Sequence, residues 1–186
     1  MDVLNSIISY DKQLLLFLHS KGSLNLDSFW ILITNPFFWI PFFIVIFFIG
    51  YKSYGIKQTL LTTIVTILAG LTSLLLVHFI KNYFQRIRPL NDSSINSSIR
   101  LIIEQNDFSF VSGHSTLSFT ISFLLYWKLK KDFKYVFIIF IFPVLFSYSR
   151  IYLGVHYPID ILFGIFLGYV IASIFFRALK QAVIRF

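Results

Sequence analysis

The sequence predicts an all-α integral membrane protein, a bundle of about five transmembrane helices with an N-terminal interfacial helix. Hydrophobic residues make up 57% of the 186 positions and charged residues only 13%, whereas ordinary soluble chains carry about 25% charged residues. The chain also holds 24 Phe, 10 Tyr and 3 Trp, more apolar surface than a soluble domain of this size can bury. The same composition excludes a disordered chain. The absence of Cys excludes disulfides, zinc-thiolate sites and thiol catalysis.

The interfacial helix is predicted over residues 3–18. Apolar residues recur at helical spacing, and Asp11 and Lys12 interrupt them. The segment has no basic leading region and no small-residue cleavage site, so we do not expect a signal peptide.

Five apolar segments predict the membrane spans, since a helical span needs about 20 mostly apolar residues. The third and fourth are short, so we expect them to extend into their flanking loops. The segments cover residues 29–50, 58–80, 114–127, 135–148 and 158–176. No internal repeat or long linker divides the chain, so we expect one domain over residues 1–186.

The basic residues predict the orientation. Of the 16 Lys and Arg residues, nine fall on one side of the predicted spans and seven on the other. Lys81, Arg88 and Arg150 are assigned to chemistry below, which leaves nine against four. The positive-inside rule then places the C-terminus in the cytoplasm and the N-terminus outside. We therefore expect the predicted site to face the outside. Because these charges are scattered between apolar runs, they indicate membrane anchors, with no nucleic acid as partner.

The first polar cluster is Lys81 and Arg88-Pro89, at the end of the second predicted span. Lys81 and Arg88 are two helical turns apart, so we expect them on one face of a helix that Pro89 ends. Two cations on one face suit an anion with several oxygens, such as phosphate. The alternative is that both side chains snorkel to the membrane surface.

The second cluster, Ser112-Gly113-His114, opens the third predicted span. Ser112 is a good N-cap and Gly113 permits close backbone approach. The free N–H groups of this helix start would face a bound anion, and His114 could donate a proton there. The alternative is a helix cap beside an interfacial histidine. Further along, Ser115, Ser118 and Ser122 predict a helix-packing stripe.

The third cluster contains Arg150, His156 and Asp160. His156 and Asp160 are four residues apart, the spacing at which helical side chains meet. Pro158 lies between them but is tolerated in a first helical turn. A carboxylate hydrogen-bonded to an imidazole fixes the tautomer and makes the other ring nitrogen a better base or nucleophile. The alternative is a structural ion pair between Arg150 and Asp160.

Together the clusters predict phosphoryl transfer without an obvious metal, in which cations stabilise charge and a histidine does covalent work. The chain has no paired-carboxylate metal motif and no nucleotide phosphate loop. A membrane protein that binds phosphate or lipid headgroups without turnover stays open as a rival. Such a protein has no need of a His156–Asp160 pair, and transporters usually have more spans or an inverted repeat.

These motifs resemble those of the type-two phosphatidic acid phosphatase superfamily, in its membrane-bound lipid phosphatase branch. The family motifs are Lys-x6-Arg-Pro, Pro-Ser-Gly-His and Ser-Arg-x5-His-x3-Asp. This chain has them, with matching spacings, between about residues 81 and 160. One position departs, because Val111 stands where the family has Pro; this change removes no functional group.

The resemblance implies a role for each residue. His156 would attack phosphorus and form a phosphohistidine, Asp160 would orient His156, and His114 would protonate the leaving oxygen and later activate water. The phosphate-binding residues would be Lys81, Arg88, Ser112, Gly113 and Arg150, with no metal or other cofactor. The substrate would be a membrane lipid phosphate. The chain resembles short bacterial undecaprenyl diphosphate phosphatases, so the expected reaction converts undecaprenyl diphosphate to undecaprenyl phosphate at the periplasmic or outer face of a bacterial inner membrane. Lipid A phosphatases and phosphatidylglycerophosphate phosphatases share the motifs and are the alternatives. Residues 100–107 overhang the predicted site and are candidates for headgroup selection.

Overall fold

A computed structural model describes residues 2–184, and every regular element in that range is helical. The longer helices are α1 (Asp2–Ser20), α2 (Leu24–Ile33), α3 (Ile40–Phe84), α4 (Gly113–Leu129), α5 (Ile141–Tyr152) and α6 (Pro158–Ile184). Short 3₁₀ helices are η1 (Pro36–Trp39), η2 (Pro89–Asn91), η3 (Asn96–Ser98) and η4 (Val136–Phe140). The predicted all-α class is confirmed.

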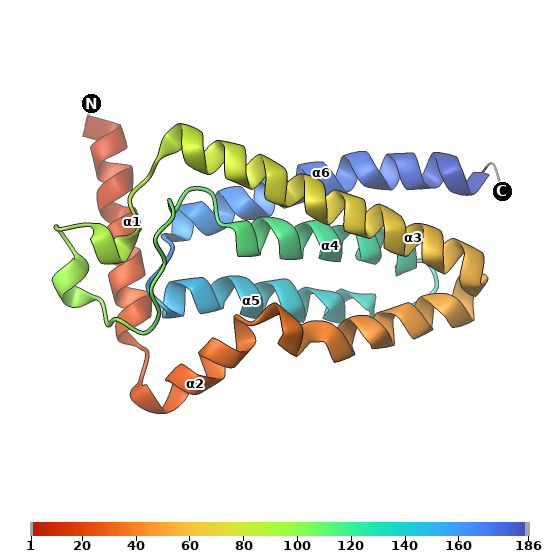
Figure 1. Cartoon of the computed structure of the whole chain (residues 1–186), viewed down its shortest axis with the longest axis horizontal. Helices are drawn as coiled ribbons and strands as arrows, with labels where there is room; N and C mark the ends of the chain where they lie inside the picture. The colour runs from red at the N-terminus through yellow and green to blue at the C-terminus, as the bar shows by residue number, and fades with distance from the viewer. Residues whose placement is uncertain (1, 185–186) are drawn as a thin grey trace.

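A kink at Gly55 folds α3 back on itself. Gly55 has φ 74° and ψ 171°, a conformation that residues with a Cβ rarely adopt. The two limbs of α3 therefore run alongside α4, α5 and α6, and together they form a bundle of five helical segments (Figure 1). By length and composition, residues Pro36–Asn91 and Pro158–Ala182 are long and apolar enough to cross a membrane. The number of spans stays a prediction.

The first predicted span is wrong at its start. Residues 29–33 belong to α2, and α3 begins only at Ile40. Asn35 precedes Pro36 and is extended, with φ −81° and ψ 120°, because the proline ring disfavours a helical conformation in the preceding residue. This break places Thr34 at the end of α2.

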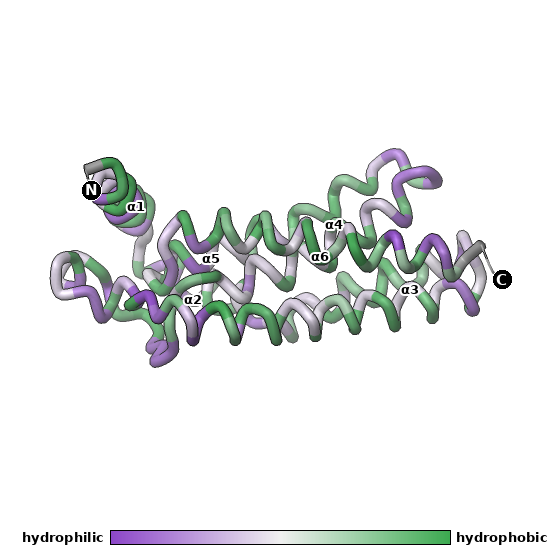
Figure 2. The backbone as a smooth tube through the Cα atoms, turned by 90° about the horizontal axis from the view of Figure 1, so that it is seen from above, coloured by the Kyte–Doolittle hydropathy of each residue, from purple (hydrophilic) through white to green (hydrophobic). Residues whose placement is uncertain are grey.

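The bundle is hydrophobic along its length and hydrophilic at its two ends (Figure 2). Large apolar side chains such as Leu75, Phe79 and Phe166 are exposed along its sides. A continuous apolar surface of this kind suits the interior of a bilayer. α1 lies across one end, roughly perpendicular to the long axis of the bundle, in both views (Figures 1 and 2).

The buried face of α1 is partly polar. Asp11, Leu15 and His19 are buried against the bundle at four-residue spacing, while Leu14 and Phe17 are exposed. The predicted helix is present, but Asp11 does not interrupt its packing. Asp11 instead faces the bundle, where it finds polar partners. The interfacial position of α1 stays a prediction.

Small residues allow α4 and α6 to pack closely. A Cβ added to Gly168 would lie 2.8 Å from the Thr116 carbonyl oxygen, and one added to Gly164 would lie 2.9 Å from the Ser115 Cβ. The predicted packing role of the α4 serine stripe is consistent with these contacts, since Ser115, Ser118 and Ser122 are all fully buried. This contact fixes the start of α4 beside the start of α6.

Candidate active site

The three predicted clusters meet at one end of the bundle, next to α1 and the loop of residues 85–112 that connects α3 to α4 (Figure 1). The end of α3, the start of α4, the end of α5 and the start of α6 all reach this place. We call it the site end, and the opposite end, at the Gly55 kink, the far end.

His156 and Asp160 form the pair that their spacing predicts. α6 begins at Pro158, so Asp160 lies in its first turn. The Asp160 Oδ2 atom lies 3.3 Å from the His156 Nδ1 atom and accepts a hydrogen bond of 3.0 Å from the Tyr157 N–H. Both side chains are buried. The alternative ion pair between Arg150 and Asp160 is wrong, because Arg150 donates to Thr34 Oγ1 at 2.7 Å.

The contacts of His156 define its tautomer. Its Nε2 atom lies 3.3 Å from the Arg88 Nη1 atom. A guanidinium can only donate, so Nε2 must carry the lone pair and Nδ1 the proton. Burial lowers the pKa of His156 well below its ordinary value, and the charges of Arg88, Arg150 and Lys81 lower it further. His156 is therefore a neutral imidazole whose lone pair faces a cationic pocket.

Lys81 and Arg88 do not share a helix face, contrary to the prediction. α3 ends at Phe84, Gln85 adopts a left-handed conformation with φ 48°, and Arg88 is extended. Because Arg88 precedes Pro89, a helical conformation is disfavoured at this residue. The loop nevertheless brings Arg88 back to Lys81. Arg88 is only 3% exposed, so the alternative that its side chain snorkels to the membrane surface is wrong.

Asp107 joins the two cations. Its carboxylate pairs with Lys81 Nζ at 2.5 Å and with Arg88 Nη2, and its backbone oxygen accepts a hydrogen bond of 2.8 Å from Arg88 Nε. The Asp107 side chain is 56% exposed. Burial raises its pKa, but the Lys81 hydrogen bond and the Arg88 charge hold it at about 2. An exchangeable carboxylate thus binds the two cations predicted to hold phosphate.

Arg150 has an unused donor. Its side chain is 2% exposed, and within residues 2–184 its Nε atom has no hydrogen-bond partner. Buried N–H groups are nearly always paired, and an unpaired one is costly. A bound anion would supply the acceptor that Arg150 Nε lacks.

The start of α4 completes the pocket. Ser112 caps the helix by accepting a hydrogen bond from the Ser115 N–H at 3.4 Å. Gly113 lies against Val77, 3.4 Å from where a Cβ would be. His114 packs on the Phe146 ring, with centroids 4.6 Å apart. It lies within electrostatic range of His156 and Arg150 and contacts Thr34.

The sequence does not predict the contacts of Asp11, Thr34 and Arg86 at this site, or the pairing of Asp107 with the two cations. Thr34 binds Arg150, and Arg86 donates to Asp160 and to Asp11 at 2.6 Å each. Arg86 had counted only as a topology charge. Its position between Lys81 and Arg88 was the one sequence signal, and nothing in the sequence connects Asp11 to Asp160.

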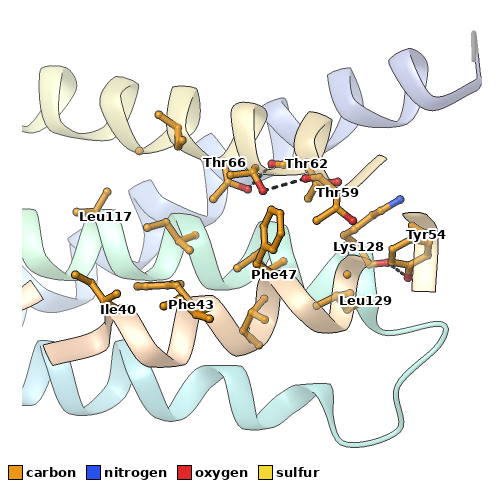
Figure 3. A pocket seen from close by; sticks show the side chains of 18 of the residues that line it. Ile40, Phe43, Phe47, Tyr54, Thr59, Thr62, Thr66, Leu117, Lys128 and Leu129 are labelled. Carbon is orange, nitrogen blue, oxygen red and sulfur yellow. Dashed lines mark hydrogen bonds between the residues drawn. The ribbon is translucent and has the colours of Figure 1, made fainter. Parts of the chain in front are cut away.

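An apolar groove of about 550 Å³ lies between the two limbs of α3 and α4, on the side of the site that leads toward the far end. Figure 3 shows Ile40, Phe43 and Phe47 of one limb and Thr59, Thr62 and Thr66 of the other lining it. Leu117 also lines it, one helical turn after His114. The groove ends near Tyr54 and Lys128 at the far end.

The chain is similar to several known proteins. The PAP2 superfamily matches residues 58–184. A lipid A 4'-phosphatase of Bacteroides thetaiotaomicron is 28% identical over 85% of this chain and 72% of its own length. An undecaprenyl-diphosphatase of Sulfolobus acidocaldarius is 32% identical over 60% of this chain and 52% of its own length. A transmembrane PAP2-type phosphatidylglycerolphosphate phosphatase from Bacillus subtilis has a similar fold, with 23% identity, a TM-score of 0.72 and coverage of 96% and 88%.

Proposed function

The chain belongs to the PAP2 superfamily, in its membrane branch, and we propose that it hydrolyses a phosphate or diphosphate group on a membrane lipid through a phosphohistidine. The observation that carries this proposal is a neutral, buried His156 whose unprotonated Nε2 faces Arg88 while Asp160 holds its Nδ1. A non-catalytic phosphate binder would need the cations but not this oriented imidazole.

Substrate binding begins with an exchange of anions. The phosphate oxygens replace the Asp107 carboxylate at Lys81 and Arg88 and accept from the unused Nε of Arg150. The Gly113 N–H lies at the start of α4, the helix end that favours anions, whereas the Ser112 N–H donates to the Asp160 carbonyl oxygen at 3.2 Å. These donors also stabilise the charge that develops on the transferring phosphoryl group.

The reaction has two steps. His156 Nε2 attacks phosphorus, the bond from phosphorus to the leaving oxygen breaks, and His114 gives that oxygen a proton. Water then attacks the phosphohistidine, His114 takes the proton of the water, and the bond between nitrogen and phosphorus breaks. Inorganic phosphate leaves and neutral His156 is restored. Asp160 stabilises the positive imidazole ring formed between the two steps.

Cationic side chains take the part that metal ions play in other phosphoryl-transfer sites. We therefore expect turnover to continue in a chelator and to be inhibited by vanadate, which mimics pentacoordinate phosphorus. Activity lost in chelator and restored by magnesium would overturn this mechanism.

The hydrocarbon chain of the substrate occupies the apolar groove between α3 and α4. The groove begins one turn from His114 and runs along the bundle among apolar side chains. A lipid could therefore remain in the bilayer while its phosphate reaches His156. This arrangement requires the five helical segments to span the membrane, with α1 at the interface and the site on the outer face of a bacterial inner membrane, as the charge distribution predicts.

An isoprenoid diphosphate such as undecaprenyl diphosphate is the proposed substrate. Its leaving group is a lipid monophosphate, which departs more readily than a lipid alkoxide and asks less of His114. Cleavage would yield undecaprenyl phosphate and inorganic phosphate.

A phosphorylated sugar lipid is the second candidate. Within residues 2–184 the chain has no large extramembrane domain to hold a sugar headgroup. This absence does not argue against a sugar lipid as substrate, since a protein named lipid A 4'-phosphatase matches 85% of the chain. A partly polar pocket within the 85–112 loop, lined by Asn91, Asn96, Ser97 and Gln105 among others, offers partners for sugar hydroxyls. Phosphatidylglycerophosphate is a third candidate, and the fold alone supports it.

Phosphate release by the purified protein tests the proposal. We expect release from lipid phosphates and none from the His156→Ala variant. Competition then ranks undecaprenyl diphosphate, lipid A and phosphatidylglycerophosphate by kcat/KM in one detergent. A tenfold advantage for either of the last two, about 1.4 kcal/mol of discrimination, would remove the isoprenoid assignment and leave the lipid phosphatase proposal standing. No release from any lipid, with folded protein, would contradict the phosphatase proposal itself.

A further inference from the structure

A series of ion pairs connects α1 to the imidazole of His156. Asp11 Oδ2 accepts a hydrogen bond of 2.6 Å from Arg86 Nη2, and Arg86 Nη1 donates one of 2.6 Å to Asp160 Oδ1. The other oxygen of Asp160, Oδ2, faces His156 Nδ1. Arg86 therefore bridges two carboxylates, one on α1 and one on α6.

Burial and further contacts hold these three side chains in place. Asp11 and Asp160 are buried, with Asp11 4% exposed. The Arg86 Cζ atom lies over the Tyr157 ring, 3.9 Å from its centroid, and this cation–π contact helps to hold the guanidinium in place. The second oxygen of Asp11 accepts a hydrogen bond of 2.9 Å from the Ile159 N–H in the first turn of α6. Both ends of the Arg86 fork are thus occupied.

The charge of this cluster bears on the nucleophile. Arg86 alone would neutralise Asp160, leaving a pair with little net field at His156. Asp11 adds a second negative charge, so the three side chains together carry one net negative charge next to the imidazole. A negative charge there stabilises the positive ring that forms when Nε2 bonds to phosphorus.

We infer that Asp11 and Arg86 are positioning residues for the proposed reaction, which hold Asp160 in place and keep a net negative charge behind His156. This inference rests on the proposed function. A purely structural role is the alternative, in which Asp11 only anchors α1 to the start of α6.

The test compares Asp11→Asn with Lys12→Gln. Lys12 is the adjacent residue on the same helix and pairs with Asp92 at 2.7 Å, whereas Arg86 pairs with Asp11 and Asp160. Both variants thus remove an ion pair between α1 and the rest of the protein, but only Asp11→Asn removes a charge from the cluster. We expect Asp11→Asn to lower kcat by tenfold or more with KM changed less than twofold, and Lys12→Gln to change neither. Asp11→Glu, which restores the carboxylate, should recover part of the loss.

The pH profile separates the two roles. The groups that face His156 are Asp160 of α6, Arg150 of α5, His114 of α4, Lys81 of α3, and Arg88 and Asp107 of the loop. Removing a negative charge from behind Asp160 disfavours the imidazolium, so the acid limb of kcat/KM should move to lower pH in Asp11→Asn. An unmoved acid limb, or equal losses in Asp11→Asn and Lys12→Gln, would overturn the inference.

A measurement without turnover keeps this inference separate from the proposed function. The imidazole nitrogens of His156 can be titrated by NMR in ¹⁵N-histidine-labelled protein, with His156→Ala to assign the signal. We expect a lower His156 pKa in Asp11→Asn than in the unmodified protein. If no lipid is hydrolysed but this shift is seen, the proposed function fails and the charge coupling stands. If hydrolysis occurs and the shift is absent, the coupling fails alone.

Discussion

The two ends of the bundle hold similar charged side chains in different surroundings. At the site end, Arg88, Arg150 and Asp160 are buried, and their partners are mostly other charged or polar side chains. At the far end, Lys128 is half-buried over the Tyr54 ring and donates to Gln58 at 3.2 Å, while Lys130 and Lys131 are exposed.

Charged side chains indicate function where their burial is costly. Exposed lysines at a membrane surface cost little and fit an anchoring role. Buried cations next to a neutral histidine are expensive, and among the described residues the Nε atom of Arg150 has no hydrogen-bond partner. The site end therefore fits a preformed anion site, and the far end fits a membrane boundary.

The most damaging change should be His156→Ala at the site end. It removes the proposed nucleophile, so we expect hydrolysis to fall to background. Lys131→Ala at the far end is the matched control and should keep full activity. Phosphate release by both purified variants, with equal folding by circular dichroism, measures the contrast. Activity above background in the His156→Ala variant would contradict the role of His156 as nucleophile.

His114→Ala should lower kcat by about 10²–10⁴-fold, the usual range for a general acid–base group. The loss should be smallest for an activated aryl phosphate, whose leaving group needs no proton. Kinetics with an aryl phosphate and a lipid monophosphate measure this dependence. Equal losses on both substrates would exclude a general-acid role for His114.

Gly168→Val tests the packing between the two ends. Its Cβ would lie 2.8 Å from the Thr116 carbonyl oxygen, so α4 and α6 must separate. We expect overpacking to cost about 1–3 kcal/mol, seen as a lower melting temperature in detergent. Gly50→Ala, whose Cβ would meet Thr59 at an ordinary 3.5 Å, is the control. Unchanged stability of Gly168→Val would contradict the close contact.

Asp107→Asn should have the smallest effect and the opposite sign. An amide binds Lys81 and Arg88 less strongly than a carboxylate, so incoming phosphate has less to displace. We expect KM, and the inhibition constant of inorganic phosphate, to fall several-fold with little change in kcat. A higher KM would mean that Asp107 orients the two cations in the bound state instead of competing for them.

Local spacing explains which parts of the site were predictable. His156 and Asp160 meet because four residues bring side chains together at one helical turn, and Ser112 caps α4 by its own position. Lys81 and Arg88 were misplaced on one helix face because α3 ends early, where the following loop is held by Arg86 and by Asp107.

Tertiary contacts explain what the sequence could not predict. Asp11 and the Ile159 N–H that it binds are 148 positions apart, and no pattern in either segment refers to the other. Thr34 reaches Arg150 only because α2 ends before Pro36 and turns toward α5. Sequence spacing identified the groups proposed to touch phosphate, whereas the groups that hold them required the fold.

A covalent phosphohistidine at His156 can be trapped and identified. Purified protein is mixed with a lipid phosphate, quenched within one turnover under alkaline conditions that preserve phosphohistidine, and digested for mass spectrometry. We expect phosphate on His156 and none in the His156→Ala variant. Phosphate on another residue, or single-turnover hydrolysis with no covalent intermediate at any time point, would contradict it.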